Sequence, residues 1–234
     1  MRAILLAAGY GKRLGSITKK KPKCLLPVNG IPLLDIWIKN LIKAKIEKIL
    51  VNTHYHSAQV KKLISESKYK KKVKITYEKK LLGTGGTFIK NIKFLKGKDC
   101  LLIHSDNYIE ENLANFINFY KKKKTKISLI GFYTKDHKDS GILKIDKKNI
   151  LQKIFEKKKI KYGNLANGAV YIISSKCQKD IVRFHSKKKD FTKEILPNYL
   201  GDISVFKTKK KFIDIGNKKR YSNLLNDKKN HKYN

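Results

Sequence analysis

The chain has 234 residues, of which 56 are Lys or Arg and 18 are Asp or Glu, giving a formal net charge of +38. A hydrophobic fraction of 41% with 10% aromatic residues is enough to build a core, which excludes a wholly disordered basic tail. The charge alone indicates a nucleic-acid or anionic-membrane partner, but 52 of the basic residues are dispersed lysines and only four are arginines. Because arginine is the usual reader of phosphates and base edges, we expect no specific nucleic-acid partner.

The cysteines indicate the compartment. Cys24, Cys100 and Cys177 are odd in number and far apart, so they predict neither a disulfide framework nor a zinc site and are typical of a reducing environment. No segment approaches the ~20 apolar residues that span a bilayer. We therefore expect a cytoplasmic protein without a membrane partner.

The first half of the chain alternates predicted strands and helices. Residues 2–7 form a continuous apolar run, and apolar residues at three- and four-residue spacing then predict a helix over 33–42. The pattern continues with strands over 48–53, 73–77 and 99–104 and helices over 57–67, capped by Ser57, and over 85–95. This order predicts an α/β fold with a Rossmann-like, doubly wound and mostly parallel sheet.

The second half has a different order of predicted strands and helices. Short strands over 142–145 and 150–155 flank a turn, and further strands over 168–174 and 203–207 accompany helical stretches over 177–185 and 191–199. No linker or repeat interrupts the chain. We expect one domain, 1–234, whose first half binds a nucleotide and whose mixed second half binds another substrate.

The residues after the first strand are the first candidate site, because ligands of open parallel sheets gather at the strands' carboxyl ends. The segment 6–14 is neither a Walker A loop nor a G-x-G-x-x-G fingerprint, since Leu14 stands where the third glycine would be. Gly9 and Gly11 still let backbone N–H groups approach an anion, and Lys12 and Arg13 add charge. A plain tight turn is the alternative interpretation.

This segment and the residues after it resemble a known family. Residues 6–14 with Thr18, Pro22 and Lys23 are similar to the N-terminal signature of sugar-phosphate nucleotidylyltransferases, especially those that guanylylate mannose 1-phosphate or heptose 1-phosphate. The resemblance continues, in the same order, at residues 83–86, 104–107, 140–142, 156–157, 167–171 and 212–216. It implies that 1–108 is the nucleotide-binding half and 109–234 the sugar-phosphate-binding half.

The resemblance also implies a reaction. The phosphate of a sugar 1-phosphate attacks the α-phosphorus of a nucleoside triphosphate and pyrophosphate leaves. Arg13 would hold the pyrophosphate and Lys23 would bridge the two reacting phosphates, while Asp106 and Asp214 would share a Mg²⁺, an ion that prefers carboxylate and phosphate oxygens. For an aspartate after a strand, the alternative is a helix cap or a turn residue.

The remaining site residues are implied in the same way. The nucleotide-binding set is Leu6, Ala8, Gly9, Gly11, Lys12, Asn52, Gly83, Thr84 and Asp106. The sugar-phosphate-binding set is Gly141, Glu156, Lys157 and Asn167, although Glu156 and Lys157 open a lysine run and have a plain surface as their alternative. We expect His54 and His56 to be ordinary residues at a strand exit, because no third metal ligand lies near them.

Three functions remain open at this stage. The favoured one uses GTP with mannose or heptose 1-phosphate and supplies a nucleotide sugar for polysaccharide synthesis, because residues 82–86 and 104–107 look most like those members. A uridylyl- or thymidylyltransferase is the alternative within the class. A catalytically silent regulator that binds a nucleotide sugar has no chemical need for all of Arg13, Lys23, Asp106 and Asp214. The sequence leaves open whether the chain forms a homo-oligomer.

Overall fold

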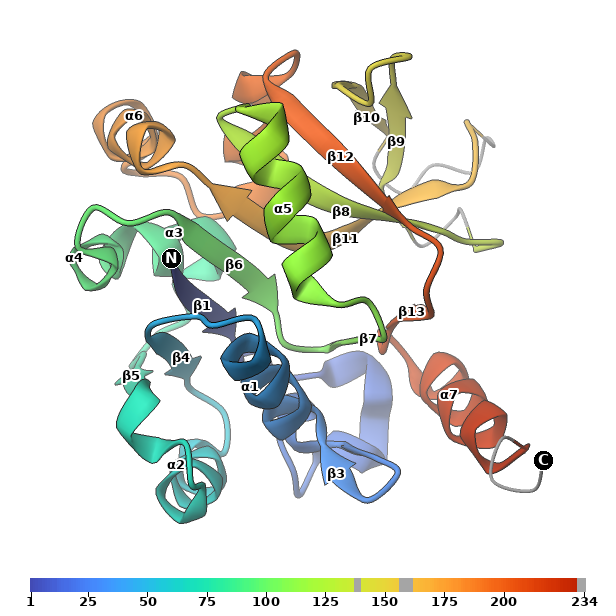
Figure 1. Ribbon diagram of the computed structural model, residues 1–234. Helices are drawn as coiled ribbons and strands as arrows, with labels where there is room; N and C mark the ends of the chain where they lie inside the picture. The colour runs from blue at the N-terminus through green and yellow to red at the C-terminus, as the bar shows by residue number, and fades with distance from the viewer. Residues whose placement is uncertain (137–139, 156–161, 231–234) are drawn as a thin grey trace.

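A nine-stranded sheet organises the molecule (Figure 1). The structure, a computed structural model, describes residues 1–136, 140–155 and 162–230. The strand order is β10-β9-β11-β6-β1-β4-β5, with β8 also paired to β11 and β12 paired to β8. These strands are β1 (Arg2–Leu6), β4 (Ile49–Thr53), β5 (Val73–Tyr77), β6 (Cys100–His104), β8 (Ile127–Tyr133), β9 (Ile142–Ile145), β10 (Leu151–Phe155), β11 (Leu165–Ile173) and β12 (Ile203–Thr208).

The N-terminal half of the sheet is entirely parallel. β1 pairs in parallel with β4 and β6, and β4 pairs in parallel with β5. Nearly every residue of β1, β4 and β6 is buried, as expected for strands covered on both faces. The crossovers run through α1 (Leu33–Lys43), α2 (Ser57–Glu66), and α3 (Gly83–Lys90) with α4 (Ile92–Leu95). The predicted doubly wound, Rossmann-like arrangement is confirmed.

The C-terminal half is mixed, also as predicted. β11 pairs antiparallel with β6, β8 and β9, whereas β12 runs parallel to β8. A bulge interrupts the β8–β11 register between Asn167 and Tyr171, and Ala169 within it has a positive φ of 52°. Bulges re-aim side chains beside active sites, and this one lies at the end of β11 that carries a predicted sugar contact.

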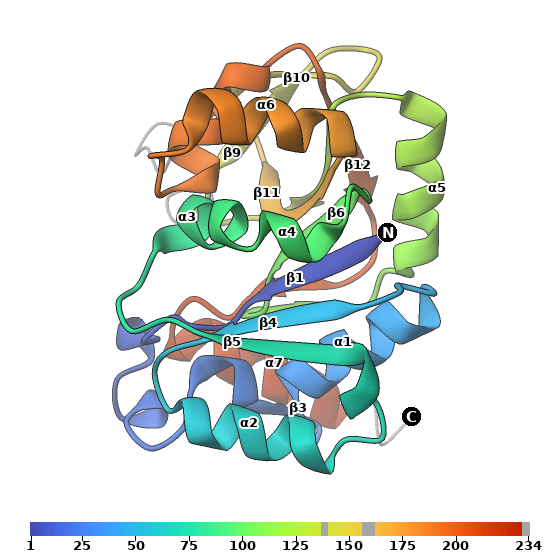
Figure 2. The same cartoon turned by 90° about the vertical axis from the view of Figure 1, so that its left-hand side faces the viewer.

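Helices cover both faces of the sheet (Figure 2). One buried cluster joins Leu5 and Val51 to side chains of α1, α2 and α5 (Leu113–Lys123), among them Trp37 and Phe116. The other joins the opposite face, through Ile4, to α3, α4 and α6 (Ser175–His185) and to the short helical turns Phe191–Ile195 and Leu196–Tyr199. Side chains on the two faces of β1 thus belong to two separate hydrophobic cores.

The carboxyl end of the sheet is closed by a third, smaller core. It packs the helical turn Lys12–Thr18 and the hairpin of β2 (Pro27–Val28) and β3 (Ile31–Pro32) against α7 (Lys218–Asn230). A two-stranded sheet of β7 (Asn107–Ile109) and β13 (Phe212–Asp214) leads the chain to α7. The buried members of the third core are Leu14, Leu26, Val28, Leu33, Ile215, Tyr221 and Leu224.

Several element boundaries differ from the sequence predictions. The helix predicted over 85–95 is two helices, α3 and α4, that meet at Asn91. Ser57 does not cap α2; His56 precedes the helix in a left-handed conformation without a side-chain cap bond. β11 begins at Leu165 rather than at 168. The bulge interrupts the alternation of inward and outward side chains along this strand, so the sequence pattern did not reveal its first residues. Within the described ranges, no helix combines the length and hydropathy needed to cross a membrane.

Candidate active site

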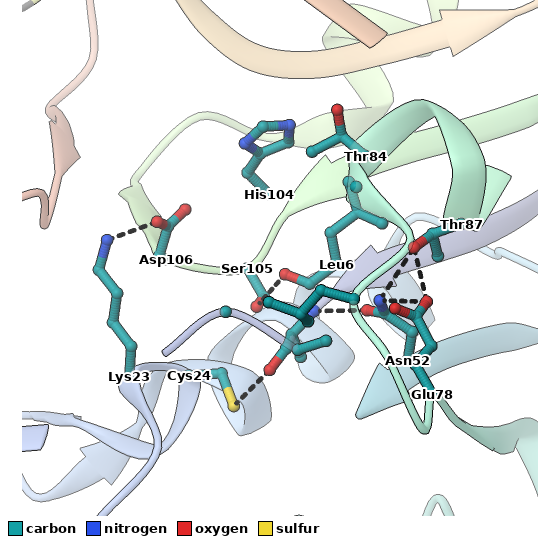
Figure 3. A pocket seen from close by; sticks show the side chains of 15 residues that line it. Leu6, Lys23, Cys24, Asn52, Glu78, Thr84, Thr87, His104, Ser105 and Asp106 are labelled. Carbon is teal, nitrogen blue, oxygen red and sulfur yellow. Dashed lines mark hydrogen bonds and ion pairs between the residues drawn. The ribbon is translucent and has the colours of Figure 1, made fainter. Parts of the chain in front are cut away.

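A cavity lies at the carboxyl ends of β1, β4 and β6 (Figure 3). Its walls come from segments far apart in sequence, namely the exit of β1, the segment around Lys23, the start of α3 and the exit of β6. Most of the predicted nucleotide-binding set lines it: Leu6, Ala8, Gly9, Asn52, Gly83, Thr84 and Asp106, together with Lys23. Gly11, Lys12 and Arg13 lie just beyond it, on the exposed turn after the β1 exit.

Specific contacts fix the backbone of the loop after β1. The backbone N–H of Ala7 donates to Asn52 Oδ1 at 2.7 Å. Gly11 has a φ of +67°, and a Cβ built there would lie 2.9 Å from Thr18 Cγ2. Thr18 Oγ1 in turn donates to the Gly11 carbonyl at 3.0 Å. The hydrogen bonds to Asn52 and Thr18 therefore fix the backbone of this loop. Glycine is required at position 11 because a side chain there would clash with Thr18 and because the positive φ favours glycine.

Lys23 and Asp106 line one end of the cavity, and Asp214 lies close to both of them, outside the cavity lining. Lys23 is 9% exposed, and its Nζ lies 2.5 Å from Asp106 Oδ2. The β7–β13 pairing sets Asp214 opposite Asn107, and the Ile215 N–H donates to the Asp106 carbonyl at 3.1 Å. Two carboxylates 108 positions apart in the chain thereby become neighbours beside one lysine.

The charges at this end act on one another. Burial favours the neutral acid at Asp106, but the adjacent Lys23 outweighs it and the pKa of Asp106 lies below its ordinary value. Burial and the charge of Asp106 raise the pKa of Asp214, with Lys23, Arg220 and Arg13 opposing the rise. Hard oxygen donors that repel each other suit a divalent cation. Within the described ranges, no cluster of three or more His, Cys, Asp or Glu side chains could hold a metal ion.

The opposite end of the cavity carries a buried acid that the sequence analysis missed. Glu78 is 1% exposed, and its Oε1 accepts hydrogen bonds from Asn52 Nδ2 at 2.9 Å and Thr87 Oγ1 at 2.6 Å. Its Oε2 accepts from the Leu82 N–H at 3.2 Å. The one signal in the sequence was an acidic residue shortly before the glycine-rich run at 83–86, which by itself indicates nothing about burial.

The packing of the protein itself requires glycine in the run at 83–86, in addition to the binding role predicted for this run. A Cβ at Gly83 would lie 2.5 Å from the Lys189 carbonyl oxygen, to which the Gly85 N–H donates at 2.7 Å. Thr84 Oγ1 accepts from the Phe191 N–H at 2.8 Å. The start of α3 is therefore fixed to the turn at 189–191.

His104 also lines the cavity and was not among the predicted site residues. Its Nε2 is buried and has no hydrogen-bond partner among the residues that the structure describes. Burial lowers the pKa of His104, which keeps the imidazole neutral. A buried polar atom facing a cavity is a natural hydrogen-bond partner for a ligand.

The predicted sugar contacts are only partly described. The Asn167 N–H donates to the Gly141 carbonyl at 2.8 Å, so these two predicted residues are brought together. Asn167 Nδ2 donates to Tyr171 Oη at 2.8 Å and its Oδ1 accepts from the Ala169 N–H. Glu156 and Lys157 lie outside the described residues.

Comparison with known proteins identifies the family. The sequence matches the nucleotidyl transferase family over residues 2–231, nearly the whole chain. The chain belongs to that family. A D-glycero-alpha-D-manno-heptose 1-phosphate guanylyltransferase from Campylobacter jejuni is 29% identical over 194 residues, covering 83% of each chain. The crystal structure of HddC from Yersinia pseudotuberculosis complexed with GMP-PN is 26% identical, with a TM-score of 0.81, and the match covers 97% of this chain and 98% of that one.

Other nucleotidyl transferase relatives are longer. The bifunctional protein GlmU of Methanococcus maripaludis is 28% identical over 92% of this chain, but the match covers 48% of GlmU. A Sulfolobus acidocaldarius relative, also 28% identical, is matched over 95% of this chain and 61% of its own length. The chain therefore spans about half to two thirds of these relatives.

Proposed function

We propose that this chain transfers a guanylyl group from GTP to mannose 1-phosphate or heptose 1-phosphate, giving a nucleotide sugar and pyrophosphate. The arrangement of Lys23 and Asp106 in the lining of a cavity at the exit of β1, with Asp214 close to both, supports this proposal. The reaction joins two polyanions, so positioning and charge neutralisation supply most of the catalysis.

Each charged residue has a role in the proposed reaction. An oxygen of the sugar phosphate attacks the α-phosphorus, the bond from that phosphorus to the β-phosphate oxygen breaks, and the electron pair leaves with pyrophosphate. Lys23 neutralises charge on the α-phosphate and the incoming phosphate, while Arg13 contacts the departing pyrophosphate. Asp106 and Asp214 are the residues that would hold Mg²⁺, which when bound offsets phosphate charge.

The preference for guanine is supported by Glu78. The edge of guanine that carries N1–H and the 2-amino group presents two donors, and a buried carboxylate offers only acceptors. Uracil and thymine present one N–H between two carbonyl oxygens, which a carboxylate repels. Oε1 of Glu78 already accepts from Asn52 and Thr87, and Oε2 accepts from the Leu82 N–H, so Oε2 has room for one of these two guanine donors.

The names of two relatives support the guanylyl assignment, one as a heptose 1-phosphate guanylyltransferase and the other as a protein crystallised with GMP-PN. A uridylyl- or thymidylyltransferase and a silent nucleotide-sugar-binding regulator are the alternatives. The phosphorylated substrates and the buried free thiols of Cys24, Cys100 and Cys177 support a cytoplasmic location, where the product would serve polysaccharide synthesis.

The test is a pyrophosphate-release screen of four nucleoside triphosphates against a panel of sugar 1-phosphates with Mg²⁺. We expect GTP with mannose or heptose 1-phosphate to give the highest kcat/KM. Glu78→Gln should lower kcat/KM for GTP by roughly 10- to 100-fold, the value of a hydrogen bond to a charged group, and should narrow its advantage over UTP. Glu66→Gln, the same change at an acid whose side chain is 65% exposed, is the matched control.

The outcomes separate the alternatives. A preference for UTP or dTTP in the wild-type protein would replace the guanylyl assignment with the alternative enzyme. Nucleotide-sugar binding without any transfer would favour the regulator. An unchanged base preference in Glu78→Gln would remove Glu78 from base recognition.

A further inference from the structure

Arg220 lies between two carboxylates at the edge of the active site. Its Nη1 donates to Asp214 Oδ2 at 2.8 Å. On the other side, its Nη2 and Nε donate to Asp136 Oδ2 at 2.6 and 3.2 Å. The Arg220 side chain is 16% exposed, against 32% for Asp214 and 46% for Asp136. A largely buried guanidinium thus connects a candidate metal ligand to the segment after β8.

The helix that carries Arg220 is firmly anchored. Asn217 Oδ1 accepts from the Arg220 N–H at 3.0 Å at the start of α7. Tyr221 Oη donates to the Pro27 carbonyl at 2.7 Å, four residues after Lys23. Tyr221 and Leu224 are buried in the third core. The backbone of Arg220 therefore has a fixed position relative to both Lys23 and Asp214.

Gly216 makes the contact between Arg220 and Asp214 sterically feasible. A Cβ built on Gly216 would lie 3.1 Å from Asp214 Oδ2 and 3.3 Å from Arg220 Nη1, the two atoms that form the hydrogen bond. Both distances are tighter than ordinary carbon contacts, so a side chain at Gly216 would push the two groups apart.

We propose that Arg220 is a positioning residue that fixes the Asp214 carboxylate for divalent-cation binding, with Asp136 orienting Arg220 in turn. The inference rests on the proposed function, because that function gives Asp214 its cation. The bond from Nη1 occupies Oδ2 and sets the plane of the carboxylate, while Oδ1 receives no hydrogen bond from the residues that the structure describes. Partners that hydrogen-bond a ligating carboxylate orient it, and their loss typically costs 10- to 100-fold in metal affinity.

The geometry favours this role over a merely structural one. An ion pair that only tied α7 to the sheet would need no contact with an acid of the site, since the third core already anchors the helix through Tyr221 and Leu224. Arg220 instead directs one nitrogen at the candidate ligand and the other two at Asp136. Its planar fork can hold both carboxylates in fixed orientations, which a lysine cannot do.

The experiment is a Mn²⁺ titration followed by electron paramagnetic resonance, with and without GTP and in the absence of sugar phosphate, so that no turnover is needed. Arg220→Met should raise the Kd for Mn²⁺ about tenfold, and Arg220→Lys and Asp136→Asn by smaller factors. Lys219→Met removes the same charge from the neighbouring, exposed position of α7 and should stay within about twofold of wild type. Thermal melts identify any variant that fails to fold, in which case Arg220→Lys and Asp136→Asn carry the comparison.

Equal Kd values for wild type and Arg220→Met, or an equal loss in Lys219→Met, would overturn the positioning role. A parallel transfer assay on the wild-type protein separates this result from the fate of the proposed function. Wild-type turnover together with unaltered Mn²⁺ affinity in Arg220→Met rejects only the role of Arg220. Absence of wild-type turnover with every substrate pair rejects the transferase itself.

Discussion

Replacing Lys23 with Met should abolish most of the turnover while leaving the protein folded. The change removes the ammonium group but retains a flexible apolar stem of similar length, which matters because Lys23 is 9% exposed. Loss of one charge aimed at the transition state costs about 2.7–4 kcal/mol in enzymes that stabilise oxyanions, or roughly 10²- to 10³-fold in kcat. We expect a fall of that size for Lys23→Met.

The cost in stability should be smaller. Removing one partner of a fully buried pair costs about 3–5 kcal/mol. The Asp106 side chain is 33% exposed, however, so solvent can take over part of the role of Lys23 and the cost falls to roughly 1–2 kcal/mol. For a chain of this size that corresponds to a fall in Tm of roughly 3–6 °C.

Pyrophosphate release under saturating substrates and a thermal melt measure the two effects separately. Turnover within about threefold of wild type would remove Lys23 from the mechanism. An activity loss that disappears when the fraction of folded protein is taken into account would mean that Lys23 is needed only for stability.

Four further results are expected. Arg13→Ala should lose about 10²-fold in turnover. Its Tm should be unchanged, because Arg13 is exposed and no hydrogen bond from its side chain is seen among the described residues. Normal turnover would exclude a role of Arg13 in holding pyrophosphate. Asp106→Asn and Asp214→Asn should each raise the Mg²⁺ concentration for half-maximal rate, and an unchanged requirement in both would mean that the triphosphate alone holds the ion. Lys98 and Arg2 lower the pKa of Glu47 to about 2, so its stabilising effect is present above its ordinary pKa and is lost as the pH falls through about 2. Urea unfolding of wild type and Glu47→Gln should therefore differ at pH 7 and converge toward pH 2, whereas a pH-independent difference would contradict the assignment. Excess DNA duplex at ~150 mM salt should leave transfer unchanged, and selective nanomolar binding that competes with GTP would restore the nucleic-acid hypothesis.

The parallel half of the fold was predictable because its strands are continuous apolar runs and its helices have a clear apolar stripe. α5, β8 and α7 were not predicted. β8 has the apolar run of a buried strand. α5 ends in three lysines, and α7 is buried through Tyr221 and Leu224, so the apolar periodicity of these two helices is a weak signal. Tertiary packing decides such segments.

The residues of the candidate site likewise fall into those that a local sequence motif predicts and those that only tertiary packing reveals. Lys23 and the glycines stand in a contiguous string, so the sequence alone pointed to them. Glu78 and His104 acquire their significance from burial, and Arg220 from a contact that joins positions 136, 214 and 220. Spacing along the chain carries no information about such distant contacts.

The third core has a consequence for the order in which the protein matures. Leu14 and Leu26, which support the loop after β1, are covered by Ile215, Tyr221 and Leu224, about 200 positions later in the chain. During synthesis from the N-terminus, the parallel sheet can assemble while this end still exposes apolar side chains. Only when residues 212–225 have emerged can the β7–β13 pairing and α7 close it. A nascent chain arrested before that point should expose apolar surface beside the unsupported loop after β1, and so be a target for chaperones before its fold is complete.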